Sequence, residues 1–162
     1  MTLHKTKNDL AEEVRVEMIS LLNQRLADGI DLMMQTKQAH WNVKGPNFIA
    51  LHELFDKIVD EVAGYVDDMA ERITQFGGTA LGTARVAASN STLAEYPLEI
   101  SDGTAHVAAL STSLATFGKG VRAAIDQAAA AGDADTADLF TGISRGIDKS
   151  LWLVEAHAQT DH

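Results

Sequence analysis

Four side chains of the kinds that bind metal ions follow one another along a single stretch of this sequence. They are His52, Asp56, Asp67 and Glu71. The same stretch carries apolar residues at steps of three and four, which predicts a helix from Phe48 to Phe76. With about 100° of rotation per residue, the polar side chains form a stripe centred about 130° from the apolar stripe. They are therefore expected to point away from the core of the fold.

A single helix cannot gather these side chains around one metal ion. His52 and Glu71 are 19 residues apart, about 28 Å along a helix, whereas a metal–ligand bond is about 2 Å long. Two antiparallel copies that cross midway between Asp56 and Asp67 bring the first pair of side chains of one chain opposite the second pair of the other. A two-fold axis there creates two equivalent sites, about 22 Å apart. Gly64 lies near the crossing and permits close approach.

A solvated polar face is the alternative explanation of this stripe, because charged residues at i, i+4 spacing commonly cover the outer side of a helix. His40 and Trp41 favour the metal site. They lie just before Gly45-Pro46, a turn that leads into the helix of His52, so His40 is expected beside His52. Two imidazoles with carboxylates suit a first-row divalent metal such as iron or zinc.

The rest of the chain is also expected to be helical. A first helix is predicted from about Asn8 to Val43, and Asn47 is the expected N-cap of the second. Residues 79–102 are rich in turn-forming residues, and a short helix is expected within them.

Ser101 or Asp102 is expected to cap a third long helix that ends at Gly132, and Asp133 to begin a fourth. Four long helices with a long connection between the second and third predict an all-α, ferritin-like four-helix bundle with one crossover. We expect a single domain over residues 1–162, with residues 1–8 as a short flexible tail.

Composition narrows the class of protein. The chain has no cysteine, which excludes a disulfide framework, a thiolate zinc site and an iron–sulfur cluster. We expect no membrane span, since no run approaches about 20 apolar residues, and no signal peptide, which makes the cytoplasm the expected compartment. The formal net charge of −10 repels nucleic acid and attracts cations.

Most of the candidate ligands lie within two longer motifs. The first is Gln38-Ala39-His40-Trp41-Asn42-Val43-Lys44-Gly45-Pro46-Asn47-Phe48, followed by Leu51-His52, and the second is Asp67-Asp68-Met69-Ala70-Glu71-Arg72. Together they closely resemble the signature of the Dps family, whose name stands for DNA-binding protein from starved cells. The resemblance covers nearly the whole chain and includes a closing stretch at residues 136–140 and 148–152.

The resemblance implies a hollow homododecamer with two-fold and three-fold interfaces. It implies sites with two iron positions each, at which zinc could compete. One subunit would supply His40, His52 and Asp56, and its two-fold mate Asp67 and Glu71. The Glu-x-x-His motif of ordinary ferritin-like di-iron proteins is absent from the chain, in agreement with the outward-facing stripe.

The implied activity is that of a ferroxidase. It oxidises Fe(II), preferentially with hydrogen peroxide as co-substrate, and stores ferric oxide in the cavity, which protects DNA and the cell from oxidative damage. The alternative function is a DNA-compacting structural protein of the nucleoid whose metal site is idle. A plain helical bundle with an acidic face is a third possibility, and it predicts a monomer.

Trp41 lies beside His40 and is expected to pack at the interface, to donate single electrons, or both. The resemblance gives a role to two further residues. Asp135 and Asp138 are expected to line a three-fold pore through which ions enter, whereas capping explains Asp133.

DNA binding is expected to be weak or absent at physiological salt. The segment before the first helix offers only Lys5 and Lys7 as phosphate contacts. The remaining histidines, His4, His106, His157 and His162, show no metal spacing, and we assign them no function.

Overall fold

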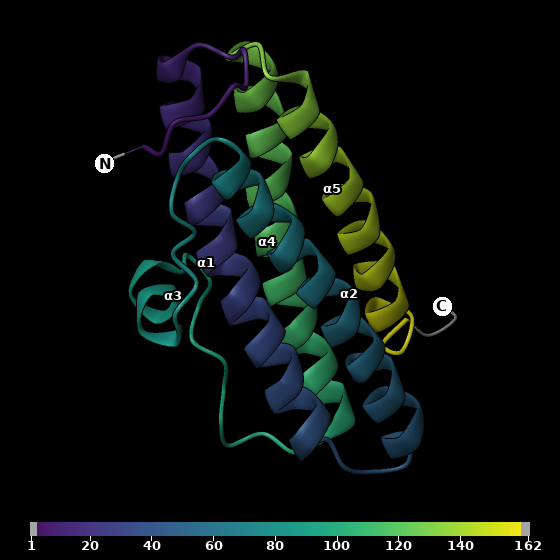
Figure 1. The fold of residues 1–162 in the computed structure, drawn as a ribbon. Coiled ribbons are helices and arrows are strands. Elements are labelled where there is room, and N and C mark those ends of the chain that lie inside the picture. The colour runs from purple at the N-terminus through teal and green to yellow at the C-terminus, as the bar shows by residue number, and fades with distance from the viewer. Residues whose placement is uncertain (1–2, 160–162) are drawn as a thin grey trace.

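The computed structural model describes residues 3–159, which form five helices. Four of them are long (Figure 1): α1 (Glu12–Asn42), α2 (Phe48–Gln75), α4 (Gly103–Ala130) and α5 (Ala134–Glu155). The fifth, α3 (Ala84–Asn90), is short and lies in the connection between α2 and α4. The all-α prediction and the short helix inside the crossover are both confirmed.

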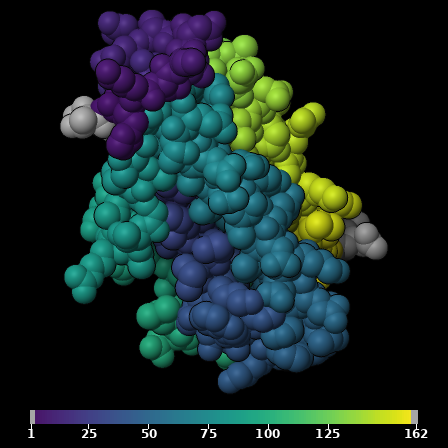
Figure 2. Space-filling view, viewed as in Figure 1, coloured from purple at the N-terminus to yellow at the C-terminus, as the bar shows by residue number. Residues whose placement is uncertain are grey.

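The long helices form two antiparallel hairpins. A turn at residues 43–47 joins α1 to α2, and these two helices pack on each other most extensively, as do α4 and α5. The crossover carries α3 against α1 and runs down the length of the bundle, so that α2 and α4 point the same way (Figure 1). Figure 2 shows the side of the molecule on which α1, α2 and the crossover lie. This is the ferritin-like topology predicted from the sequence.

The core follows the apolar periodicity of the sequence. On α2 the predicted stripe is buried at every position except Val66, which is half-buried. Aromatic side chains of three helices, Phe55, Phe117 and Phe140, are each at most 1% exposed, and burying such a ring contributes about 1.5–3 kcal/mol. None of the helices among residues 3–159 is both long and apolar enough to cross a membrane.

Two of the three expected N-caps are confirmed. The carboxylate of Asp102 accepts hydrogen bonds from the backbone N–H groups of Thr104 and Ala105, and that of Asp133 accepts one from Thr136. Asn47 precedes α2 as expected, but its side chain makes no capping hydrogen bond. That part of the prediction is wrong, because the tight turn satisfies the start of α2 through backbone bonds such as Phe48 N–H to Gly45 O.

The first helix begins at Glu12 rather than near Asn8. The Asn8 carboxamide accepts a hydrogen bond from the Leu10 N–H at 3.0 Å, and such local side-chain bonds compete with helix formation. The expected free tail is partly packed against the bundle, since the His4 N–H donates to Gly77 O at 2.8 Å and Leu3 contacts the core. Residues 1 and 2 lie outside the described part of the chain.

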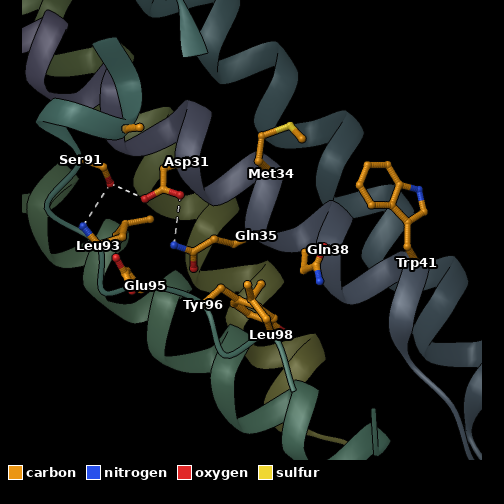
Figure 3. Close-up of a pocket in the computed structure, with 11 residues that line it drawn as sticks. Asp31, Met34, Gln35, Gln38, Trp41, Ser91, Leu93, Glu95, Tyr96 and Leu98 are labelled. Atoms are coloured by element: carbon orange, nitrogen blue, oxygen red, sulfur yellow. Dashed lines mark hydrogen bonds between the residues drawn. The ribbon is translucent and has the colours of Figure 1, made fainter. Parts of the chain in front are cut away.

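Polar side chains of α1 fix the path of the crossover. The Asp28 carboxylate, 1% exposed, accepts bonds from the backbone and hydroxyl of Thr92. Figure 3 shows Asp31 between Ser91 and Gln35, and Gln35 also donates to the backbone oxygen of Ala94. Unpaired buried polar groups are costly, so these contacts define one route along α1.

Candidate metal centre

The turn between α1 and α2 brings two histidines together. His40 lies in the last turn of α1 and His52 in the first turns of α2. Their rings stack with centroids 3.8 Å apart and an interplanar angle of 20°. This is the neighbour relation expected from the sequence.

Reciprocal hydrogen bonds fix both imidazoles. Nδ1 of His40 lies 2.8 Å from the carbonyl oxygen of His52, and Nδ1 of His52 lies 2.9 Å from that of His40. A carbonyl oxygen only accepts, so each Nδ1 carries the hydrogen. Each neutral ring therefore keeps its lone pair on Nε2, the arrangement by which backbone carbonyls orient metal-binding histidines.

Asp56 lies one turn beyond His52 on the same face of α2. Its Oδ1 atom is 3.9 Å from Nε2 of His40 and accepts a hydrogen bond from the ammonium group of Lys37. The hydrogen bond from Lys37 lowers the pKa of Asp56 below its ordinary value, with desolvation opposing this effect and the charge of Lys37 adding to it. Asp56 is therefore a carboxylate at neutral pH.

These three side chains border an open hollow of about 460 Å³ on the outer surface of the bundle. Phe48 packs against the second histidine, with its ring centroid 5.1 Å from that of His52. The hollow is lined by His40, Ile49, His52, Glu53, Asp56, Lys57 and Asp60.

The other two expected ligands lie elsewhere on α2. Asp67 and Glu71 are both exposed, and neither lines the hollow. Within residues 3–159, no three or more His, Cys, Asp or Glu side chains converge in a way that could hold a metal ion. One chain thus brings His40, His52 and Asp56 together without completing a coordination sphere, and the contribution of Asp67 and Glu71 from a second chain stays a prediction.

Comparison with known proteins decides the family. Residues 19–161 match the family described as a Ferritin-like domain. The DNA protection during starvation protein of Agrobacterium fabrum is 47% identical over 159 residues, which are 98% of this chain and 98% of that protein. The chain belongs to the Dps family of ferritin-like proteins. Membership supports a role in iron storage and in the protection of DNA during starvation.

Solved Dps structures share the whole fold of this Dps chain. DpsA14 from Streptomyces coelicolor superposes with a TM-score of 0.93 at 36% identity and covers 99% of this chain and 95% of its own. The tetragonal form of Mycobacterium smegmatis Dps gives a TM-score of 0.92 at 32% identity, with 97% and 96% covered.

Trp41, next to His40, points away from the core of its own subunit. Its side chain is 59% exposed and borders a second hollow, of about 560 Å³, between α1 and the crossover (Figure 3). Met34 of α1 and Leu98 of the crossover border the same hollow and are also exposed. More than half of the Trp41 side chain is therefore not packed against its own subunit.

The acidic residues at the start of α5 differ in their surroundings. Asp133 is 2% exposed and pairs with Arg72 at 3.1 Å, so its role is structural. Asp135 and Asp138 are exposed, and the pore role expected for them stays a prediction. Lys5 and Lys7 are exposed on the N-terminal segment.

Two neighbours of the histidines were not singled out in the sequence. Phe48 directly follows the turn, and Lys37 precedes His40 by one helical turn on the same face of α1. The i, i+3 spacing of Lys37 was the available signal, but it does not reveal which carboxylate the lysine meets.

The remaining buried histidine belongs to the core. His106 is 1% exposed, and its Nδ1 atom lies 2.8 Å from the hydroxyl of Tyr96. Burial raises the pKa of Tyr96, so the hydroxyl stays protonated and donates to His106. Burial also lowers the pKa of His106, against the opposing effects of the Ile100 backbone, the Asp102 carboxylate and the Asn42 backbone.

Proposed function

We propose that this protein is a ferroxidase and iron store that oxidises Fe(II), preferentially with hydrogen peroxide. The observation that carries the proposal is the stacked pair His40 and His52, in which both Nδ1 atoms bond to backbone oxygens and Nε2 of His40 lies 3.9 Å from the carboxylate of Asp56. Neutral imidazole and carboxylate together suit iron. The position of this group on an outer face supports a site shared between subunits.

A second copy of the chain completes the site in this proposal. Asp67 and Glu71 of the partner subunit approach the histidine pair across a two-fold axis, and the exposure of both residues in one chain supports this. Twelve subunits enclose the cavity that holds ferric oxide. Exposed Asp135 and Asp138 surround the three-fold pore and attract entering cations.

The ligand set favours oxidation. Histidine nitrogens hold the entering Fe(II), and hard carboxylate oxygens prefer the Fe(III) that forms. Two Fe(II) ions each give one electron to one peroxide, whose O–O bond breaks to two hydroxide ions, so no hydroxyl radical is released. Trp41 would intercept a stray oxidising equivalent or pack at the interface, and zinc would compete as a redox-inert ion.

DNA binding is proposed to be weak or absent at physiological salt. The net charge of each chain is −10, and twelve such chains repel the phosphate backbone. Iron chemistry is therefore the activity by which this protein protects DNA.

The test is an anaerobic Fe(II) titration followed by stoichiometric peroxide, with Fe(III) and protons counted. Wild-type protein should oxidise two irons per peroxide. The double variant His40→Gly with His52→Gly should still assemble, but its oxidation should be slower by about a hundredfold or more, because the loss of metal ligands costs several kcal/mol. Asp67→Asn should do comparable damage. Unchanged kinetics in an assembled double variant would remove the basis of the proposal.

A further inference from the structure

The positively charged end of Lys37 lies against the carboxylate of Asp56, one of the candidate metal ligands. Its ammonium group donates a hydrogen bond to Oδ1 of Asp56, the same atom that lies 3.9 Å from Nε2 of His40. We propose that Lys37 is a built-in competitor, whose ammonium group occupies one of the two cation positions and must leave Asp56 before a second metal ion binds there. This inference rests on the proposed metal site and deepens it.

The arrangement follows from the two helices that meet at the hollow. Lys37 and His40 are one turn apart on α1, so both side chains face Asp56 on α2. An ammonium hydrogen directed at a carboxylate oxygen takes up one of its lone pairs, and the positive charge beside that oxygen repels a metal ion. The lysine and the metal therefore compete for one oxygen atom rather than merely sharing a neighbourhood.

The competition is limited in strength. The Lys37 side chain is 28% exposed and that of Asp56 is 48% exposed, so water screens their attraction. A lysine also has a flexible four-carbon stem, which lets its charged end move into solvent. Lys37 should therefore weaken metal binding at Asp56 without preventing it.

The two metal positions become unequal as a result. One ion can use an imidazole nitrogen together with the carboxylates of the partner subunit and leave the Lys37–Asp56 pair intact. A second ion needs Asp56 and has to displace the ammonium group. Lys37 thus sets the difference between a tight and a weak position, and the second iron binds only where Fe(II) is abundant.

Zinc titration of the assembled protein tests this, because Zn(II) binds without redox chemistry. Wild type should show one tight and one weak class of site. In Lys37→Met the weak class should tighten by about fivefold to tenfold, since one charged hydrogen bond no longer has to be broken. Lys37→Gln should shift in the same direction, and Lys37→Arg should keep the weak class weak.

Two control variants separate the possible outcomes. Lys57→Met removes a positive charge from the same hollow, and Lys57 makes no ion pair with another described residue. Equal tightening in Lys57→Met and Lys37→Met would overturn the proposal, because the net charge of the hollow would then explain the effect. An unchanged weak class in Lys37→Met would also overturn it. Asp56→Asn should abolish the weak class, and if it leaves zinc binding intact, the metal site itself is misassigned.

Discussion

At the residue scale, histidines of this chain serve two purposes according to which ring nitrogen they use. His40 and His52 donate through Nδ1 to backbone oxygens and keep Nε2 available. His106 instead accepts the Tyr96 hydroxyl on Nδ1 and is closed off from solvent. Residue type alone does not separate these cases, because the choice depends on donors and acceptors supplied by other parts of the chain.

We predict that His106 makes stability fall at acidic pH. Burial lowers the pKa of His106 in the folded state, so the unfolded chain binds a proton first as the pH drops below about 6.5. Wild type should be more stable than His106→Gln at pH 8, and the difference in unfolding free energy should shrink toward pH 5. Denaturant unfolding at several pH values measures this.

Tyr96→Phe is the matched control for this prediction. It removes the hydrogen-bond donor but keeps the buried imidazole. The stability of Tyr96→Phe should therefore fall as the pH is lowered, as that of wild type does. A constant difference between wild type and His106→Gln across this pH range would contradict the prediction.

Among individual residues, the sequence predicted those whose role depends on type and local spacing. The pairing of His40 with His52 followed from a short turn. The contact of Lys37 with Asp56 did not, because it depends on how far α1 and α2 are rotated about their axes, which packing against the whole core determines.

At the element scale, α2 carries two stripes with different purposes. Its apolar stripe follows the helical period and could be predicted almost residue by residue. The start of α1 was harder to predict, since the Asn8 side chain accepts a hydrogen bond from the Leu10 N–H ahead of the helix. The polar stripe was visible in the sequence. Its proposed partners lie on a second copy of α2, which a single chain does not position.

Gly64 gives a test of the face that α2 presents to a partner. A Cβ atom at Gly64 would meet nothing within 4 Å in this chain, so a larger side chain should not disturb the subunit itself. Gly64→Leu should nevertheless block close approach of two α2 helices, give smaller species in size-exclusion chromatography and lose iron oxidation.

Gly64→Ala is the control, because it also removes the helix penalty of glycine, up to about 1 kcal/mol, but adds little volume. It should assemble. A Gly64→Leu protein that forms a full shell and oxidises iron at the wild-type rate would show that the helices cross elsewhere.

At the scale of the whole molecule, sharing of sites between subunits predicts rescue in hybrid shells. A His52→Gly subunit and an Asp67→Asn subunit each inactivate their own shells. In a mixed pair both lesions fall in one site and leave the other site whole, so shells reassembled from the two variants should regain part of the activity. Iron oxidation no faster than in the unmixed variants would refute a site built from two chains.

The N-terminal segment makes a separate prediction about DNA. Deletion of residues 1–8 removes Lys5 and Lys7, the phosphate contacts expected for this segment. Because DNA binding is proposed to be weak or absent, wild type and the deletion variant should migrate alike with DNA at physiological salt in a gel-shift assay. Retardation by wild type that the deletion abolishes would show that the segment binds DNA.

The architecture of the whole chain could be predicted because helix periods and turn signals are local. The route of the crossover could not, since it depends on Asp28 and Gln35 finding partners about 60 residues away. No sequence pattern within residues 79–102 indicates those contacts.

The two histidines also bear on the order in which the molecule folds. They are twelve residues apart, so their stacking is among the shortest-range tertiary contacts of the bundle, and such contacts require little loop closure. The α1–α2 hairpin can pair them while later helices are still being synthesised. The half of the metal centre that one chain supplies is then an early product of folding, whereas contacts such as Ser150 with Glu61, 89 residues apart, require the whole chain.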